Sequence, residues 1–419
     1  MSALESGVPA PDLALLDAGA SLAQLETESL EVIATGAGLS RVEMVAWRDM
    51  GHPEAGGSEL HAARIAERWA SAGIDVTMKA SRSPGHQSCD TYGDVRLRRP
   101  AGRYSVFPAV ALGGRLRSSR GRPDGVVEIW NGVPFFSSLW AGCAQTVFLH
   151  HVHDGMWDLT LPAPLAAFGR FLELRVAPPF YRNAPIVTLS ESSRDTIVSM
   201  MGFDKDQIRV IHPGVDPFYA PGGTRAEHPL FVAVGRLMPY KRYDVLIDAL
   251  AAVHAAHPTL EALIVGTGPE RAALQARIDS HGAAEWLRMP GFIDADSLRA
   301  AYRRAWAVMS ASAFEGWGMT LTEAAACRTP AIASAIAGHS DAVWDGRSGL
   351  LFEDRAQLEA ALRALVERPA LRARLQEGAA QRASALSWDR TALGTLQMLA
   401  LDAHRRRAAG SRHRGAALT

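Results

Sequence analysis

The chain has 419 residues, 48% of them apolar, and its 44 Lys and Arg side chains balance its 44 Asp and Glu side chains. At about 100–200 residues per domain, this length predicts two or three domains, and the apolar fraction excludes an intrinsically disordered chain. The zero net charge argues against non-specific binding of nucleic acid, which requires a basic surface. Three scattered cysteines exclude a disulfide framework and a CxxC-type zinc site.

Neither a membrane span nor a secretory signal is expected. The chain has no run of about 18 apolar residues, and no basic segment precedes the apolar part of its N-terminus. Residues 1–40 are predicted to be an extension with at most one weak helix. The basic stretch 405–414 is expected to be a solvated tail, which we place at 408–419. These features predict a cytoplasmic protein without stable membrane insertion.

The first half of the chain alternates short β-branched runs with amphipathic runs. Strands are predicted over 42–47, 74–80, 125–130, 146–152, 185–190 and 208–212, and helices over 57–73 and 191–201. Ser190 is the expected N-cap of the second helix. Strands separated by helices indicate a parallel sheet covered on both faces.

A loop-like segment, 213–229, contains four prolines and three glycines and is the predicted linker. The same rhythm then restarts, with strands over 230–236, 260–266, 287–292, 307–312 and 330–335 and helices over 242–256, 268–281, 295–304 and 319–327. A last helix is predicted over 388–407. The expected fold is therefore two doubly wound α/β domains, 41–222 and 228–387, facing across a ligand cleft.

Two glutamates stand eight residues apart in Glu315-Gly-Trp-Gly-Met-Thr-Leu-Thr-Glu323, directly after the predicted strand 307–312. Glycines let the backbone approach a ligand, and the free N–H groups at a helix start attract anions and sugar oxygens. A carboxylate one turn into the helix suits a ribose diol, because it accepts two hydroxyl hydrogen bonds. The alternative is an ordinary turn with two solvated acids.

Two cations, Arg236 and Lys241, follow the strand 230–236. The carboxyl end of such a strand is where open α/β sheets bind ligands. Arg236 can bind a diphosphate through two parallel hydrogen bonds, and Lys241 can act as a point charge. The alternative is an exposed basic loop.

A glycine turn, Gly56-Gly57, and three close histidines, His150, His151 and His153, mark the predicted N-terminal domain. The turn lacks the GxGxxG and GxxxxGK[ST] patterns, so a nicotinamide or P-loop site is not supported. Adjacent positions of a strand point to opposite faces, so His150 and His151 cannot bind one metal ion. We expect one or two of these histidines to face the cleft, and we predict no metal site.

Taken in this order, the motifs resemble those of the family-4 retaining glycosyltransferases of the GT-B fold, which has two Rossmann-like domains. The resemblance covers about 42 to 400. Its most specific part is the Glu-x7-Glu motif, and further parts are the GRLxPxKR segment at 235–242, GTGPE at 266–270, PGF at 290–292 and PGVD at 213–216. In this family the terminal helix, here 388–407, packs back on the first domain.

The resemblance implies a role for each matching residue. Arg236 and Lys241 would hold the donor diphosphate, Glu323 the ribose, and Glu315 with the backbone of Gly316, Trp317, Gly318, Met319 and Thr320 the transferred sugar. Gly57 and Gly266 would approach the donor, the base would lie near Phe292 and Ile293, and His150 is our preferred sugar-contacting histidine, with His151 and His153 open.

The implied reaction moves a hexose-type sugar from a UDP- or GDP-sugar to an acceptor hydroxyl with retention, and it needs no cofactor or metal. A glycosidase carboxylate pair is weighed lower, because it needs no diphosphate clamp. Acidic residues at 49–59 and 154–158 favour a neutral or cationic small acceptor, such as an aminocyclitol, over an anionic lipid. A lipid or polysaccharide precursor, a related epimerase or phosphorylase, and a non-catalytic sugar-nucleotide sensor remain alternatives.

Overall fold

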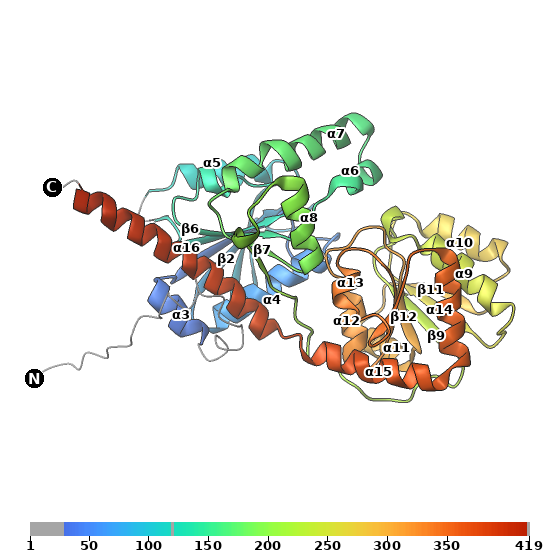
Figure 1. Ribbon diagram of the computed structural model, residues 1–419. Helices are drawn as coiled ribbons and strands as arrows, with labels where there is room; N and C mark the ends of the chain where they lie inside the picture. The colour runs from blue at the N-terminus through green and yellow to red at the C-terminus, as the bar shows by residue number, and fades with distance from the viewer. Residues whose placement is uncertain (1–28, 119–120, 417–419) are drawn as a thin grey trace, which may run out of the picture.

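The computed structural model of the chain describes residues 29–118 and 121–416. Two α/β domains lie beside each other in Figure 1, one coloured blue to green and the other yellow to orange. Each is built on one twisted sheet, and the predicted fold class is confirmed.

The N-terminal domain contains an eight-stranded sheet in the order β3-β4-β2-β1-β5-β6-β7-β8, in which only the edge strand β3 is antiparallel. Its strands are β1 (Arg41–Val45), β2 (Asp75–Ser81), β3 (Cys89–Tyr92), β4 (Val95–Ala101), β5 (Gly125–Trp130), β6 (Ala144–Leu149), β7 (Ile186–Thr188) and β8 (Ile208–Val210). Its helices are α3 (Leu30–Ala37), α4 (Gly57–Ser71), α5 (Val106–Arg115), α6 (Asp154–Thr160), α7 (Ala163–Phe171) and α8 (Glu191–Met201). Short turns are η2 (Ser137–Leu139), the π-helical η3 (Leu172–Val176), η4 (Pro178–Tyr181) and η5 (Lys205–Gln207).

The C-terminal domain contains a six-stranded parallel sheet in the order β11-β10-β9-β12-β13-β14. Its strands are β9 (Leu230–Val234), β10 (Glu261–Val265), β11 (Leu287–Gly291), β12 (Ala307–Ser310), β13 (Ala331–Ser334) and β14 (Gly349–Phe352). Its helices are η6 (Pro239–Lys241), α9 (Tyr243–His254), α10 (Arg271–Ser280), α11 (Ala295–Arg304), α12 (Met319–Ala326), α13 (His339–Ala342), α14 (Arg355–Glu367) and α15 (Pro369–Ser384). The strand order reverses between β9 and β12, so the loops after these two strands open the crevice of a doubly wound sheet.

Local sequence accounts for the elements that carry the site. Both β5 and β6 are buried along their whole length, as expected for central parallel strands. The α4 helix begins with a capping interaction in which the Gly56 N–H donates to Glu59 Oε2 (2.8 Å). Ser190 caps α8 as predicted, because its Oγ accepts from the Ser193 N–H (3.1 Å).

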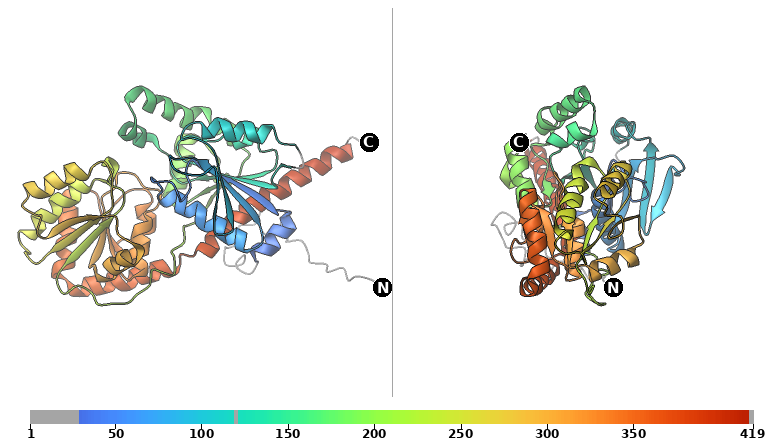
Figure 2. Two further views of the ribbon diagram at one scale, coloured as in Figure 1. Left: turned by 180° about the vertical axis from the view of Figure 1, so that it is seen from behind. Right: turned by 90° about the vertical axis from the view of Figure 1, so that its right-hand side faces the viewer.

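The last helix, α16 (Trp388–Ala416), leaves the C-terminal domain and lies across the N-terminal one (Figures 1 and 2). Leu396 and Leu399 pack in one apolar cluster with Phe148 of β6 and Leu39. Trp69 of α4 donates from Nε1 to the Ala392 carbonyl (2.9 Å). The helix therefore completes the N-terminal domain, as the resemblance implied.

One predicted boundary is wrong. The domain begins before residue 41, because Ile33, Ala34 and Ala37 of α3 are buried in the cluster under α16. The helix α16 also runs past its predicted end at 407 to residue 416, and its residues 405–409 are exposed. Residues 1–28 of the predicted extension 1–40 and residues 417–419 of the predicted tail lie outside the described residues.

Five large apolar side chains are exposed on the helices that follow β6 in the chain. They are Leu159, Leu165, Phe168, Phe171 and Phe180 of α6, α7 and η4. The sequence analysis did not anticipate this surface, and exposed apolar groups of this size often mark interaction sites. Across the described residues, no helix has the length and apolar character needed to cross a membrane.

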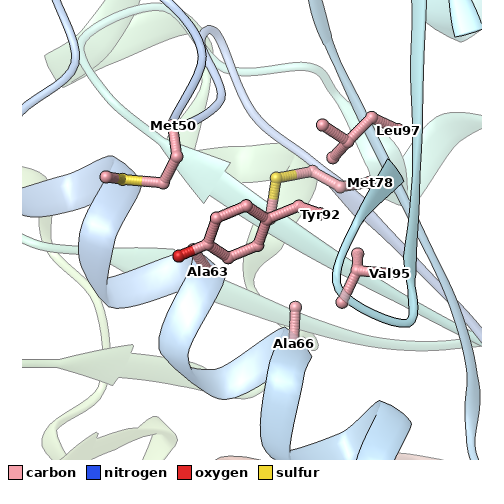
Figure 3. A pocket seen from close by; sticks show the side chains of 7 residues that line it. All are labelled: Met50, Ala63, Ala66, Met78, Tyr92, Val95 and Leu97. Atoms are coloured by element: carbon pink, nitrogen blue, oxygen red, sulfur yellow. The ribbon is translucent and has the colours of Figure 1, made fainter. Parts of the chain in front are cut away.

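A small pocket of about 10 Å³ lies between α4 and the β2–β4 edge of the sheet, under Met50 (Figure 3). Figure 3 shows Tyr92 and Met78 side by side within it, with only apolar groups around them apart from the Tyr92 hydroxyl. This space holds one water at most. The pocket is therefore a packing gap and competes with no ligand site.

Candidate active site

The site lies where the loops after β9 and β12 meet at the strand-order reversal of the C-terminal sheet. Lys241, in η6 after β9, pairs through Nζ with Oε1 of Glu315, which follows β12. The two residues are 74 positions apart in the chain, and they meet because β9 and β12 are neighbours in the sheet. The predicted cation and the predicted carboxylate therefore share one site.

Charge partners decide the ionisation of Glu315. Burial raises its pKa, but Lys241 and His339 outweigh that effect, and the pKa falls below the usual range. Ser312 Oγ also donates to Glu315 Oε1 (3.1 Å). The site thus holds a carboxylate next to an ammonium group, ready to bind hydroxyl and phosphate groups at once.

Arg236 lies next to Lys241 and keeps its charge available. Its Nη2 donates to the Tyr240 hydroxyl (3.2 Å), and no carboxylate in the described part of the chain pairs with it. A guanidinium group of this kind can bind a phosphate through two parallel hydrogen bonds.

Beside these cations, the backbones of two glycine turns, one after β9 and one after β10, are in close contact. Gly235 and Gly266, which end β9 and β10, have φ values of 153° and 138°. A Cβ on Gly266 would lie 1.9 Å from the Gly235 carbonyl oxygen. Only glycine fits here, so the loop geometry depends on this residue type.

The start of α12 presents backbone toward the same space. Gly318 has φ 100° and precedes the first helical residue, Met319, so free N–H groups point to the site from the first turn, which includes Thr320. The Trp317 side chain is buried and lies against His212 with the two rings tilted by 31° (4.7 Å between centroids). The indole is therefore part of the core, and a contact of Trp317 with a ligand would have to come from its backbone.

Glu323 lies at the wall of a cavity of about 390 Å³ between the two domains. Arg64 of α4, Asp216 of the linker and Ala295 of α11 line the same cavity, together with Trp388. Tyr302 donates from its hydroxyl to Glu323 Oε2 (3.2 Å). Burial, aided by Asp216, raises the pKa of Glu323 to about 7.

Phe292 and Ile293 directly follow β11, the edge strand of the C-terminal sheet. Phe292 is 83% exposed, whereas Ile293 packs against the Leu230 and Val232 cluster. An exposed aromatic ring beside a fixed backbone segment is suited to a flat base.

Residues of the N-terminal domain lie on the opposite side of the candidate site. A Cβ on Gly57 would lie 3.2 Å from Met319 Sδ, and one on Gly316 would lie 2.9 Å from the His150 carbonyl oxygen. Ser192 of α8 reaches Asp341 of α13 from its backbone N–H (3.2 Å) and accepts from the Gly338 N–H (2.9 Å). Gly57 and the loop after β6 therefore lie against the start of α12 and the loop before it, and α8 contacts α13.

The preference for His150 as the sugar-contacting histidine is not supported by the structure. The His150 Nε2 lies 3.2 Å from Nδ1 of His61 inside the N-terminal domain, and burial lowers the pKa of His150 to about 3. The β6 strand ends at Leu149, so the alternation of a strand extending to 152 does not apply. The loop around Gly316 is contacted by the backbone of His150 but by the side chain of His151, whose Nδ1 lies 3.6 Å from a Cβ placed on Gly316.

The acidic stretches do not supply free negative charge. Asp49 forms a buried pair with Arg99 (2.6 Å), and Glu54 and Glu59 both pair with Arg48 (3.1 Å each). Asp154 and Asp158 both pair with Arg170. Because arginines of the same domain neutralise these carboxylates, the acidic stretches do not favour a cationic acceptor.

His339 is a site residue that the sequence analysis missed. Its Nδ1 contacts Ser334, and its Nε2 is buried without a partner, 3.3 Å from a Cβ placed on Gly318. Gly338, directly before His339, is the local sequence feature that could have indicated this residue. A glycine before a short helix after β13 repeats the pattern seen after β12.

No group of three metal-ligating side chains occurs within residues 29–118 and 121–416. Asp294, in an Asp-x-Asp sequence, instead caps α11, because its Oδ1 accepts from the Ser297 N–H (2.9 Å).

Two family models match adjoining parts of the chain. The model described as Glycosyltransferase Family 4 matches residues 55–218, and the one described as Glycosyl transferases group 1 matches 219–382. Together with two facing doubly wound domains, these matches define a glycosyltransferase enzyme of the GT-B fold. The chain belongs to glycosyltransferase family 4.

Relatives and solved structures agree with this assignment. A D-inositol 3-phosphate glycosyltransferase of Nocardioides sp. is 27% identical over 83% of this chain and 86% of its own length. Another protein of that name, from Acidothermus cellulolyticus, is 34% identical over 50% of this chain and 52% of its own.

Two solved structures share the fold. Sucrose-phosphate synthase of Thermosynechococcus elongatus has a TM-score of 0.73 at 20% identity, over 88% of this chain and 100% of that chain. Anabaena HepE, solved with UDP and glucose, has a TM-score of 0.65 at 18% identity, over 89% of this chain and 100% of that chain.

Proposed function

We propose that this glycosyltransferase moves a hexose-type sugar from a UDP- or GDP-sugar to a hydroxyl of a small polar acceptor, with retention of anomeric configuration. The proposal rests on the Lys241–Glu315 pair and on Arg236 beside it, which pairs with no carboxylate among the described residues. Two cations suit a diphosphate, and an adjacent carboxylate suits sugar hydroxyls.

The division of labour follows from these positions. Arg236, Lys241 and the start of α12 would neutralise the diphosphate as the glycosidic bond breaks. Glu315 would orient the sugar hydroxyls, and Glu323 the ribose. The donor phosphate itself would take the acceptor proton on the same face, which gives retention. Closure of Gly57 onto Met319 would exclude water and favour transfer over hydrolysis.

The comparisons support the substrate classes. HepE was solved with UDP and with UDP-glucose, which supports a uridine diphosphate donor. The relatives named D-inositol 3-phosphate glycosyltransferases support a polyhydroxylated ring as the acceptor class. The three free cysteines fit the proposed cytoplasmic setting.

A screen of UDP- and GDP-sugars by thermal shift, followed by mass spectrometry with cyclitol and aminocyclitol acceptors, tests this proposal. Transfer with an α-linked product from an α-linked donor is expected. A product of inverted configuration would contradict retention. Donor binding without transfer or hydrolysis would instead favour the non-catalytic sensor.

A second acceptor class is a lipid-linked saccharide, favoured by the exposed apolar side chains of α6 and α7. The same assay with a water-soluble acceptor and with its lipid-linked form in detergent separates the two. A strong preference for the lipid-linked form would replace the small polar acceptor.

Donor affinity is expected to depend on pH through Glu323. With its pKa raised to about 7 by burial, the side chain is mostly ionised at pH 8 and mostly protonated at pH 6. Because the ionised form accepts two ribose hydroxyls, Kd for the donor should rise about tenfold from pH 8 to pH 6. The pKa values of the neighbouring Tyr302 and Tyr219 are raised by burial, so both stay neutral in this range.

Calorimetric titration with UDP at both pH values measures this effect. The Glu323→Gln variant should bind weakly and equally at both. A wild-type Kd that does not change between pH 6 and 8 would contradict the assignment.

A further inference from the structure

The loop after β6 carries two stacked histidines at the cleft. His151 and His153 have ring centroids 4.5 Å apart and an interplanar angle of 24°. His151 approaches the donor loop at Gly316. His153, the other ring of the stack, has a fully buried carboxylate behind it.

Behind His153 lies Glu173, a carboxylate with no exposed surface. Its Oε1 accepts from the His153 backbone N–H (3.1 Å) and lies 3.3 Å from His153 Nδ1. Its Oε2 accepts from Trp157 Nε1 (2.8 Å). Among the described residues no lysine or arginine pairs with Glu173, so its two oxygens are contacted by N–H groups and the His153 ring alone.

The backbone around Glu173 is also irregular. The residue lies in η3, a π-helical turn that directly follows α7, and it is the buried residue of that turn. Single π turns are rare, and they are frequent at functional sites.

Both oxygens of Glu173 accept hydrogen bonds from N–H groups that can only donate, the His153 backbone N–H and Trp157 Nε1. The remaining contact, between Oε1 and His153 Nδ1, is a hydrogen bond when Nδ1 carries the ring proton. With the ring proton on Nδ1, Nε2 can accept a hydrogen bond from a substrate hydroxyl. His153 is partly exposed, whereas the Nε2 atoms of His61 and His151 are buried.

We propose that Glu173 is a positioning residue that locks His153 with Nδ1 protonated and thereby presents Nε2 to a hydroxyl of the transferred sugar. This inference rests on the proposed function and replaces His150 by His153 as the sugar-contacting histidine. Glu173 touches no substrate and acts through the ring.

Histidine ring ¹⁵N spectra of the free protein test the first half without any substrate. The wild type should show a ring with protonated Nδ1 that disappears in His153→Asn and changes its tautomer balance in Glu173→Gln. A matched control is Glu128→Gln, because Glu128 is equally buried in the same domain but is bonded to Tyr181 and to the N–H groups of Phe135 and Ser137. That control should leave the His153 signal unchanged.

Kinetics test the second half. Loss of a ring-orienting partner usually costs about 10–100-fold, so Glu173→Gln should lower kcat by that factor with donor Kd within threefold, whereas Glu128→Gln should not. In a His153→Asn background, Glu173→Gln should have no further effect. An unchanged tautomer in Glu173→Gln, or additive losses in the double variant, would overturn the proposal. Absence of transfer by the wild type would instead count against the proposed function.

Discussion

Replacing Lys241 by Ala is expected to lower kcat for sugar transfer about 10²–10³-fold, the usual cost of removing one preorganised group that stabilises developing charge. Lys241 is in contact with Glu315 and follows β9 together with the unpaired Arg236. As the glycosidic bond breaks, negative charge grows on the leaving diphosphate, and the ammonium group stabilises that charge more than the ground state. The substitution also leaves Glu315 partly buried without its cation, which weakens sugar orientation.

Three measurements make this result specific. Calorimetry with UDP should show a loss of donor affinity smaller than the loss of kcat. Lys205→Ala removes an exposed lysine of the N-terminal domain. This control should keep the wild-type donor affinity and the wild-type kcat. Lys241→Arg keeps the charge but alters its geometry, and it should retain part of the activity. Transfer by Lys241→Ala within threefold of the wild type would refute the assignment.

Gly266→Ala is expected to destabilise the C-terminal domain by about 3 kcal/mol or more, because it combines a strained φ with a clash in packed backbone. The new Cβ would lie 1.9 Å from the Gly235 carbonyl oxygen, and no flexible side chain is available to move aside. For a domain of this size the loss corresponds to roughly 6–12 °C in Tm. Donor binding should fall too, because the turn after β9 that carries Arg236 is displaced.

Gly282→Ala is the matched control. Gly282 also has positive φ (61°) in the same domain, but nothing lies within 4 Å of its added Cβ. It should cost only about 1 kcal/mol, the price of the left-handed conformation alone. Scanning calorimetry compares the two variants. Equal Tm values would show that the contact between the two turns does not constrain the site.

The sequence predicted which residues come together wherever their proximity depends on strand order. Lys241 and Glu315 were both placed after strands of one sheet, and a doubly wound topology then brings the ends of β9 and β12 together. Glu323 was correctly expected one turn into α12. These inferences succeed because parallel strands, glycine turns and helix starts each follow from a few adjacent residues.

Other features depend on contacts that no local pattern reports. The preference for His150 assumed a strand that extends to residue 152, but β6 ends at Leu149 and the His150 ring is buried, so the alternation of strand residues does not apply to this loop. The β4 strand was missed because Arg99 occupies a buried position, neutralised by Asp49 from a distant loop. Glu173 drew no attention because a glutamate in an apolar stretch is ordinarily solvent-exposed.

The course of α16 has a consequence for how the protein is made. Synthesis proceeds from the N-terminus, so the sheet around β6 and the α4 helix are complete long before Leu396 and Leu399 exist to cover them. The backbone N–H of Gln145 donates a hydrogen bond to Asp402 Oδ2 (2.8 Å), so it also lacks this acceptor until Asp402 has been synthesised. The C-terminal domain, by contrast, has all its strands and helices before α16 begins. The half of the enzyme made first is therefore the half that finishes folding last, and its uncovered apolar surface during translation is where chaperones would be needed.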